Sequence, residues 1–339
     1  MKRHFYKLSA IFWTLGCLSG QTLTTANNDR TEMNLKGEVK SVESELYNLI
    51  PEKDTFRLGE KINGLSIDRN SLVEFNERGQ LTSSKEFLSN GDVREETIYT
   101  YDKSDRLIHR KEIDNYGRGS FYDYNFSYNS VDSITKVVIS NLDFKRIHQI
   151  TRDEKNRITE NKIIQSDTVI AIYTRRYDKN GNIIEENEYR KENVPVKIIS
   201  RTFDQKNLKQ TEQITKYNKW DTLSYEIKFT YDSNQNLMEE KEYDSDTVFI
   251  KTTNSYFEGG QLKETRTIPM GSFNSIIITQ KFNKKGDLVE HSREPRDGTD
   301  KNIWTYKYNY DSNGNWIKKI EYKNETPLRM VKRSIEYYQ

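Results

Sequence analysis

The sequence predicts an all-β protein: about ten β-hairpin repeats of ~26 residues, joined into a curved or superhelical antiparallel meander sheet. Three observations support this prediction. Apolar and polar residues alternate with period two over many short stretches, and an aromatic–turn–apolar unit recurs along the chain. Hydrophobic residues make up only 33% of the chain, yet aromatic residues reach 12%. Such a composition is poor for a thick globular core and suits half-buried strands.

The recurring unit is clearest in YDKNGNI, which begins at Tyr177, and YDSNGNW, which begins at Tyr310. We call the first residue the anchor and the apolar residue after the turn the closing residue. Successive anchors lie 24 to 28 residues apart, which leaves no room for a helix or a separate domain between them. The ten anchors are Phe75, Tyr101, Tyr128, Arg152, Tyr177, Phe203, Tyr231, Tyr256, Phe282 and Tyr310. The closing residues are Leu81, Leu107, Ile134, Ile158, Ile183, Leu208, Leu237, Leu262, Leu288 and Trp316.

The fifth residue of each unit explains the pattern physically. Nine of the ten are Gly, Asn or Asp, which tolerate a left-handed backbone. A hairpin made of a type I turn and a left-handed bulge residue needs that conformation at one fixed position. We therefore expect the anchor and the closing residue to meet across a hairpin. The fifth residues are Gly79, Asp105, Asp132, Asn156, Gly181, Asn207, Gln235, Gly260, Gly286 and Gly314.

The stretches beside each turn read as strands. YEIKFTY (225–231) alternates with period two, and charged stretches such as LMEEKEY (237–243) follow the closing residues. Two strands per unit give on the order of 20 strands. Open sheets of that size curl, split or close, so we expect a curved sheet with aromatic residues on its concave side and Lys and Glu outside.

The first 20 residues resemble a signal peptide. Three basic residues precede a short apolar stretch from Leu8 to Leu18, which is too short to span a membrane as a helix. Cleavage before Gln21 is the first interpretation. Lipid attachment at Cys17 is the second, and a retained anchor is the third. The expected location is therefore the periplasm, the outer-membrane surface or the medium.

The remaining chain divides into three parts. Residues 21–34 look like a flexible leader. Residues 35–74 are expected to form N-terminal strands or a cap, with an opening strand at 35–50 that ends at Pro51. Residues 75–339 form the repeat array.

Charge and cysteine content limit the possible functions. Cleavage before Gln21 would remove three basic residues and no acidic one, leaving 51 basic and 52 acidic side chains. A near-neutral chain without a basic block argues against nucleic acid as a partner. Cys17 is the only cysteine, so the mature chain would hold no disulfide, thiol nucleophile or zinc–thiolate site.

The units starting at Tyr177 and Tyr310 resemble the YD repeat of Rhs-type and wall-associated bacterial proteins. The resemblance covers roughly residues 75 to 339 and implies a sheet built from hairpins. Large family members wrap such a sheet into a shell around a toxin, and some members are thought to bind carbohydrate. This chain is far shorter, and it lacks the Asp-Pro-rich self-cleavage motif and a separate toxin segment at its C-terminal end. It is more similar to the small secreted YD-repeat proteins common in Bacteroidetes-type bacteria.

No catalytic, metal or cofactor motif stands out. His109, His148 and His291 lie far apart and are expected to be solvated strand residues. Paired acids such as Glu185-Glu186 and Glu239-Glu240 should point to opposite faces of a strand, which does not suit a glycosidase pair. The DKNGN turns place Gly at loop position four rather than the EF-hand's position six. A lipid-spanning barrel is disfavoured because strands such as EEKEY carry charges on both faces.

Aromatic residues offer the one candidate site. Trp304, Tyr306, Tyr308, Tyr310 and Trp316 could stack on sugar rings, because Tyr and Trp combine an apolar body with a polar tip. The competing interpretation is that they fill the inside of the curled sheet, since aliphatic residues are few. We expect the second role to dominate and binding to be possible where the concave face is wet.

The function predicted from these observations is a non-catalytic, exported repeat module of the bacterial envelope that binds a glycan or a surface protein. No cofactor is expected, and membrane contact is expected only through a lipid at Cys17. One alternative is an accessory part of an Rhs-like toxin or immunity system, which rests on the family resemblance. A glycan-active enzyme is the weaker alternative.

Overall fold

The computed structural model describes residues 29–339 except 54, 65–67, 117–118 and 272–274. The described residues form 23 antiparallel strands in one sheet, together with two very short helices. The prediction of an all-β protein is therefore confirmed. Neither helix among the described residues has the length and apolar character needed to cross a membrane.

The elements follow one another along the chain as α1 (Asp29–Glu32), β1 (Val39–Glu52), β2 (Thr55–Lys61), β3 (Asn70–Phe75), β4 (Leu81–Phe87), β5 (Val93–Tyr101), β6 (Leu107–Asp114), β7 (Ser120–Tyr128), β8 (Ile134–Ser140), β9 (Lys145–Arg152), β10 (Ile158–Gln165), β11 (Thr168–Tyr177), β12 (Ile183–Arg190), η2 (Lys191–Asn193), β13 (Val194–Phe203), β14 (Lys209–Tyr217), β15 (Thr222–Tyr231), β16 (Leu237–Asp244), β17 (Thr247–Tyr256), β18 (Leu262–Pro269), β19 (Ile276–Phe282), β20 (Leu288–Pro295), β21 (Asn302–Tyr310), β22 (Trp316–Lys323) and β23 (Thr326–Tyr337).

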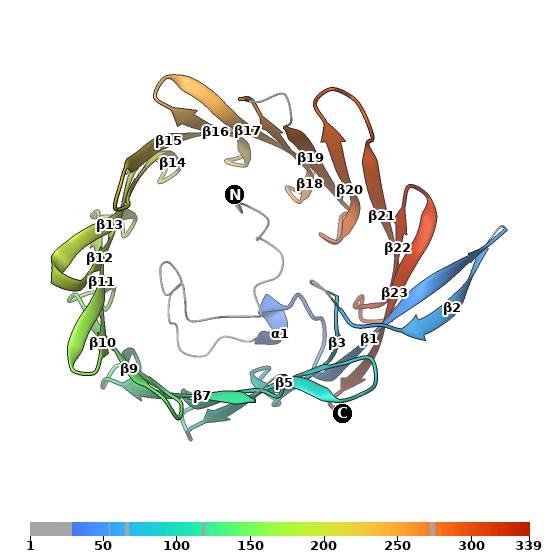
Figure 1. The fold of residues 1–339 in the computed structure, drawn as a ribbon, viewed down its shortest axis with the longest axis horizontal. Coiled ribbons are helices and arrows are strands. Elements are labelled where there is room, and N and C mark those ends of the chain that lie inside the picture. Colours follow the sequence, from blue (N-terminus) through green and yellow to red (C-terminus); the bar gives the residue numbers. More distant parts are fainter. Residues whose placement is uncertain (1–28, 54, 65–67, 117–118, 272–274) are drawn as a thin grey trace.

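The sheet closes into a 22-stranded barrel (Figure 1). Consecutive strands from β3 to β23 pair with each other, and β1 pairs with β3 on one side and β23 on the other. Strand β2 pairs only with β1 among the described strands and lies outside the ring. The expectation of an open curved or superhelical meander is therefore wrong.

Two strands outside the predicted hairpins explain the closure. A ring in which every neighbour is antiparallel needs an even number of strands, because direction alternates around it. The run from β3 to β22 leaves one free edge at each end, and β23 and β1 join those edges through a long ladder from Val39↔Tyr337 to Asn48↔Arg329. The count of about ten repeats does not describe this fold, since β1, β2 and β23 lie outside that count.

The local turn chemistry is confirmed. All ten fifth residues have a positive φ, from Asp132 at 56° to Gly181 at 91°. In each turn the amide of the fifth residue donates to the carbonyl of the residue after the anchor, as in Gly181 N–H to Asp178 O at 3.2 Å. Asp178 Oδ1 also accepts from the amides of Asn180 and Asn182 at 2.9 and 2.8 Å. The Asp side chain therefore holds its own turn, as its position suggests.

Anchor and closing residue pair across the hairpin in nine of the ten units. Examples are Tyr177↔Ile183 and Tyr310↔Trp316. The exception is FDQKNL (203–208), which is one residue shorter than the other units. There Lys209 pairs with Phe203, so the prediction of Leu208 as the closing residue is wrong. The Leu208 amide donates to Asp204 within the turn instead, because Leu208 takes the sixth place of that unit.

Anchor tyrosines also connect neighbouring hairpins. The Tyr177 hydroxyl donates to the Ile158 carbonyl at 2.7 Å, and the Tyr231 hydroxyl donates to the Lys209 carbonyl at 2.9 Å. Tyr101, Tyr128 and Tyr256 bond to Leu81, Leu107 and Leu237 in the same way, each at 2.8 Å. Each bond contributes about 1 kcal/mol to stability. A phenylalanine anchor packs similarly but cannot form this connection.

Residues 29–38 lie inside the ring, and we call them the clasp segment (Figure 1). Leu35 packs with Val39, Val42, Val73 and Phe75, so these side chains define the inner face of the sheet. By strand register the same face carries the buried clusters around Tyr124 and Val137 and around Ile199 and Tyr225. The core is thus a concave layer that lines the ring.

The clasp segment joins the turns of the first and last repeat units, which begin at Phe75 and Tyr310. Leu81 N–H donates to Asp29 Oδ2 at 2.6 Å, and Arg30 N–H donates to the Gly79 carbonyl at 3.1 Å. At the other turn, Asn315 Nδ2 donates to the Lys36 carbonyl at 2.8 Å and Asn315 Oδ1 accepts from the Lys36 amide at 2.7 Å. Residues 29–34, assigned to a flexible leader by sequence, therefore contain α1 (Asp29–Glu32) and pack against the barrel. Residues 21–28 lie outside the described residues.

The N-terminal strand region also differs from its expected bounds. The predicted strand at 35–50 corresponds to β1, which begins at Val39 and continues through Pro51 to Glu52. Beyond Asn48, β1 pairs only with β2, and this two-stranded ribbon points away from the ring (Figure 1). Proline is tolerated there because a strand edge without a neighbour needs no amide donor.

Candidate functional site

The predicted aromatic residues lie together on the inner face of β21 and β22. Tyr308 pairs with Lys319 of β22, Lys319 pairs with Val331 of β23, and Val331 pairs with the buried Leu46 of β1. Because paired residues lie on the same face of the sheet, Tyr308 shares the inner face with Leu46. The five predicted residues are Trp304, Tyr306, Tyr308, Tyr310 and Trp316, and each is half-buried. With Lys319, Arg329 and Arg333 they form what we call the aromatic wall.

Side-chain contacts occupy much of the aromatic wall. The ring centroids of Tyr308 and Tyr310 are 6.1 Å apart, and those of Tyr308 and Trp316 are 6.0 Å apart. The Arg333 guanidinium carbon lies 3.3 Å from the Trp316 centroid, and Lys285 Nζ lies 3.5 Å from that of Tyr310. Such cations over rings contribute about 1 kcal/mol each.

The phenol groups of this wall stay protonated over the physiological range. Burial and the hydrogen bond to Asp287 raise the pKa of Tyr310 to about 12. Burial also raises the pKa values of Tyr306 and Tyr308. The Tyr308 hydroxyl donates to the Leu288 carbonyl at 2.8 Å and is therefore already satisfied.

A carboxylate from a distant segment reaches this wall. Asp68, just before β3, is buried and pairs with Lys319 Nζ. Arg333 lies deep in the same region. Burial lowers the pKa of its guanidinium to about 10, although the negative charge of Asp68 acts in the other direction and raises it. Sequence reasoning missed Asp68 because no local pattern connects it with Lys319, which lies 251 positions away.

The three histidines have different environments. His148 is only 2% exposed, and burial lowers its pKa to about 4. The expectation that His148 is solvated is therefore wrong, because Val137 and Ile163 flank it on the inner face. His109 Nε2 lies 3.0 Å from Asp123 Oδ1, and the tilted rings of His291 and Trp304 have centroids 5.4 Å apart.

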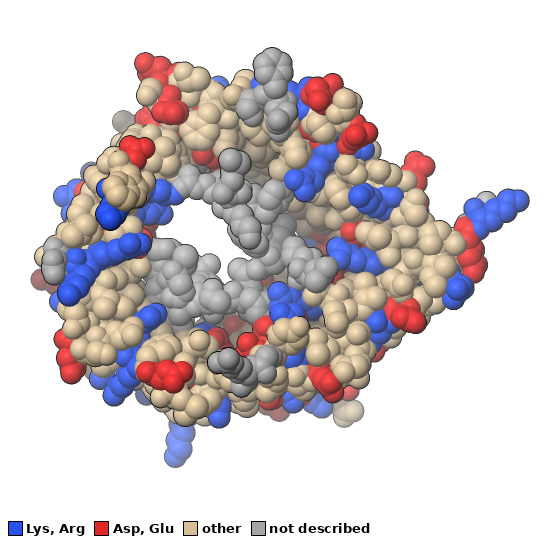
Figure 2. Space-filling model, viewed as in Figure 1, with Lys and Arg blue, Asp and Glu red and all other residues tan. Residues whose placement is uncertain are grey.

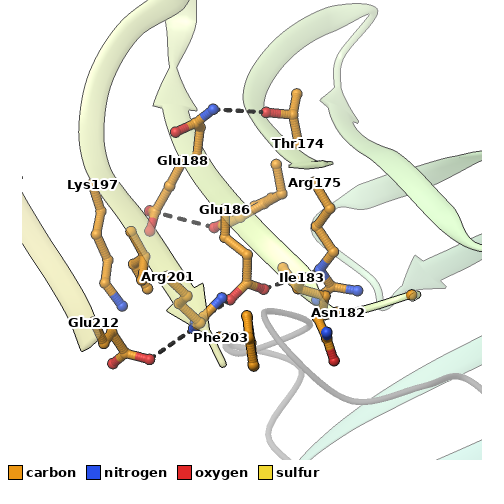
Figure 3. Close-up of a pocket in the computed structure, with 14 residues that line it drawn as sticks. Thr174, Arg175, Asn182, Ile183, Glu186, Glu188, Lys197, Arg201, Phe203 and Glu212 are labelled. Atoms are coloured by element: carbon orange, nitrogen blue, oxygen red, sulfur yellow. Dashed lines mark hydrogen bonds and ion pairs between the residues drawn. The ribbon is translucent and has the colours of Figure 1, made fainter. Parts of the chain in front are cut away.

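A second group of polar residues lines the opposite side of the ring. We call the inner face of β11 to β14 the charged wall (Figure 3). Glu186 accepts from Arg175 Nε at 3.0 Å and from Arg201 Nη2 at 2.6 Å. Glu212 accepts from Arg201 Nε at 2.7 Å and from Lys209 Nζ at 3.1 Å. Four strands are thus connected by one chain of ion pairs.

The charged wall remains ionised despite its burial. Burial opposes the charge of Arg201, but its bonds to Glu212 and Glu186 prevail and raise its pKa. Burial likewise opposes the charge of Glu212, but Lys209 and Arg201 prevail and lower its pKa. The side chains of Arg201 and Glu212 are 14% exposed, so the pairs are partly desolvated and hold fixed positions. This wall contradicts the expectation that charged strand residues all face outward.

A hollow of about 600 Å³ lies over the charged wall. Its lining includes three basic residues (Arg175, Lys197 and Arg201) and three acidic residues (Glu186, Glu188 and Glu212). Tyr173, Ile199 and Phe203 supply apolar surface between them. The labelled charged side chains converge on this hollow from neighbouring strands (Figure 3). The arrangement offers fixed hydrogen-bond donors and acceptors around a net charge of zero.

The paired acids of the sequence separate as expected. Glu186 lies on the inner face, whereas its neighbour Glu185 pairs with Arg176 at 3.2 Å on the outer face. Glu239 on the outer face holds Lys241 and Lys251 at 2.6 Å each. Among the described residues no group of three or more His, Cys, Asp and Glu could hold a metal ion. Cys17, the possible lipid attachment site, lies outside the described residues.

No protein-family model matches the sequence, and no curated protein matches it either. Among solved structures, a TcdB2-TccC3-Cdc42 complex is similar to 80% of this chain at 14% identity with a TM-score of 0.43, and this chain covers 16% of its length. A porin-like protein from Bacteroides uniformis is similar to 89% of this chain at 10% identity with a TM-score of 0.31, and 98% of it is covered. Both scores are too low to support a function, and the likeness to YD repeats rests on the residue pattern alone.

Proposed function

We propose that this protein is an exported, non-catalytic barrel module of the bacterial envelope that binds a glycan or a surface protein within its ring. The observation that carries the proposal is the inner face, where a hollow of about 600 Å³ lies among fixed charged and aromatic side chains. Pockets that bind ligands combine apolar surface with a few well-placed polar groups. An opening is visible at the centre of the ring (Figure 2).

The outer face supports a barrel surrounded by water. Its strands carry ion pairs such as Lys85–Glu96 at 3.3 Å and Lys281–Glu290 at 2.9 Å. A barrel that spans a lipid bilayer needs an apolar outer band instead. The basic and acidic residues visible around the ring agree with this description (Figure 2).

The aromatic wall and the charged wall are both candidates for the binding surface. The aromatic wall has less room, because Asp68, Arg333 and Lys285 already contact its side chains. Its main role is therefore structural, and stacking on sugar rings remains the proposal for any part of it that water reaches. The charged wall carries the hollow of about 600 Å³.

A glycan array with the purified protein tests the proposal, with labelled envelope extracts as the second arm. We expect binding to at least one glycan class or one reproducible envelope protein. If the aromatic wall takes the ligand, the Y306A/Y308A/W316A variant should lose binding with an unchanged circular dichroism spectrum. The control is Tyr116→Ala, an exposed residue outside both walls. Absence of binding in both arms at micromolar protein would overturn the proposed function.

A further inference from the structure

The hollow over the charged wall has the geometry of an extended groove. Its lining comes from four neighbouring strands, β11 to β14. Strands lie ~4.8 Å apart, so the groove crosses about 15 Å of sheet. The groove is therefore longer than one sugar ring and matches the length of a short chain of such rings.

The groove is electrically balanced. Its three basic and three acidic lining residues cancel, and four of them already form ion pairs at 2.6 to 3.0 Å. A polyanion would gain little here, because Glu186, Glu188 and Glu212 repel it. A polycation would likewise be repelled by Arg175, Lys197 and Arg201. The charge pattern therefore favours an uncharged ligand.

The polar groups are arranged for hydroxyls. Guanidinium groups donate and carboxylates accept, and they alternate across the strands as Arg175, Glu186, Arg201 and Glu212. A hydroxyl can donate to one and accept from the other. Because the ion pairs fix these groups before binding, little side-chain entropy is lost, and hydrogen bonds to charged groups are stronger than neutral ones.

Apolar surface lies beside the charged groups. Tyr173, Ile199 and Phe203 also line the groove, and Tyr173 Oη lies 3.4 Å from Glu188. Aromatic faces pack against the C–H face of a ring while polar groups bind its edge. A ligand with an apolar face and a hydroxyl-rich edge satisfies both kinds of lining.

We infer that the charged wall is a subsite for a neutral, hydroxyl-rich chain, that is, an uncharged oligosaccharide of about three or more sugar units. This inference rests on the proposed function and makes one of its two ligand classes specific. Lys197 stands opposite Glu188 with its side chain directed into the groove (Figure 3). It is therefore the position at which a larger side chain blocks the groove.

Isothermal titration with neutral hexasaccharides of glucose and of N-acetylglucosamine tests the inference, with polygalacturonate hexamer as the anionic probe. We expect a neutral hexasaccharide to bind with less than a twofold change in Kd between 50 and 500 mM NaCl (on the order of a tenfold range of salt). We expect K197W to weaken that binding at least tenfold, on the order of the loss of one hydrogen bond to a charged group. The matched control T202W places tryptophan on the exposed outer face of the same strand and should bind as the parent does.

Three results would overturn the inference. Neutral sugar bound equally well by K197W would place the ligand elsewhere while leaving the proposed function intact. Preference for the anionic probe with a steep salt dependence would reject the neutral class. Binding of an envelope protein with no saccharide bound would support the other ligand class of the proposed function. If K197W fails to fold by circular dichroism, Y173L replaces it, because that variant removes the stacking face without adding volume.

Discussion

The two walls of the barrel interior arise from the same kind of hairpin and are filled differently. The aromatic wall lies next to the seam where β23 meets β1, and the charged wall lies across the ring from it (Figure 1). At the seam, the clasp segment and Asp68 approach the inner face. Across the ring, side chains of the wall itself pair with one another and leave a hollow. Among the described residues, therefore, segments outside the repeat units cover the inner face at the seam, whereas the charged wall is filled by side chains of its own strands.

Charges are stabilised differently in the two walls. Arg201 of the charged wall bridges two carboxylates at 2.6 and 2.7 Å. Arg333 of the aromatic wall stacks on Trp316, and its Nε has no hydrogen-bond partner among the described residues. Loss of this bridging cation removes one partner from each of two partly buried carboxylates, which keep only Arg175 and Lys209 respectively, whereas loss of a stacked cation removes one ring contact. The same substitution should therefore have unequal effects.

Arg201→Met tests this difference and has the largest expected effect. It leaves Glu186 and Glu212 without their shared partner, and we expect a loss of about 3 kcal/mol in the free energy of unfolding. Arg333→Met should cost less than about 1 kcal/mol, because removal of a buried charge offsets the loss of the ring contact with Trp316 and of the attraction to Asp68. Urea unfolding followed by tryptophan fluorescence measures both values. Equal losses in the two variants would contradict the assignment of a bridging role to Arg201 alone.

Local features of the fold could be predicted from sequence. The left-handed residues, such as Gly181 and Asn207, are recognisable because few residue types tolerate a positive φ. The pairing of Tyr177 with Ile183 follows from the turn that lies between them. Both conclusions depend on sterics within a few residues.

Closure of the ring could not be predicted, because its contacts are distant in sequence. Val42 pairs with Ile335, and Asn315 binds the main chain of Lys36. No local spacing marks either pair. Strand β1 reads as an opening strand until the position of β23 is known.

The charged wall escaped sequence reasoning for a different reason. In EENEYR (185–190) both faces of β12 carry polar residues, so hydrophobic periodicity does not indicate which face is inside. Glu186 and Glu188 face inward, whereas Glu185 and Asn187 face outward. The aromatic wall was recognisable because Tyr306, Tyr308 and Tyr310 alternate with polar residues.

Asp29→Asn tests the clasp segment and has an intermediate expected effect. Burial raises the pKa of Asp29 from 3.8 to about 6, so ionisation is disfavoured in the folded state. The parent protein therefore loses stability as pH rises from about 4 through 6, whereas the uncharged amide of the D29N variant avoids this loss and its oxygen still accepts the Leu81 amide bond. We expect D29N to be more stable than the parent by about 2 kcal/mol at pH 8 and by nearly nothing below pH 4.

Unfolding free energies of D29N and the parent at pH 3.5, 5, 6 and 8 measure this difference. The pKa shift sets an upper limit on the difference in free energy of unfolding between D29N and the parent. Because the carboxylate is partly exposed, we expect a difference below that limit. Asp143→Asn is the control, since it makes the same change at an exposed aspartate outside the clasp segment. A destabilised D29N at pH 8 would show that the ionised carboxylate holds the clasp segment in place.

Gly314→Val and Gly181→Val compare the two walls at matched turns and have the smallest expected effect. Both glycines have a positive φ, 87° and 91°, and a Cβ at either position meets no close neighbour, so the cost comes from backbone conformation alone. We expect each variant to lose about 1–2 kcal/mol. Hydrogen exchange should separate them: G314V should also reduce protection near Lys36 and Leu81, because Asn315 in the same turn binds the clasp segment. Protection losses in G181V should stay within β11 to β14, and losses confined to β21 and β22 in G314V would mean that the clasp segment does not couple the first and last turns.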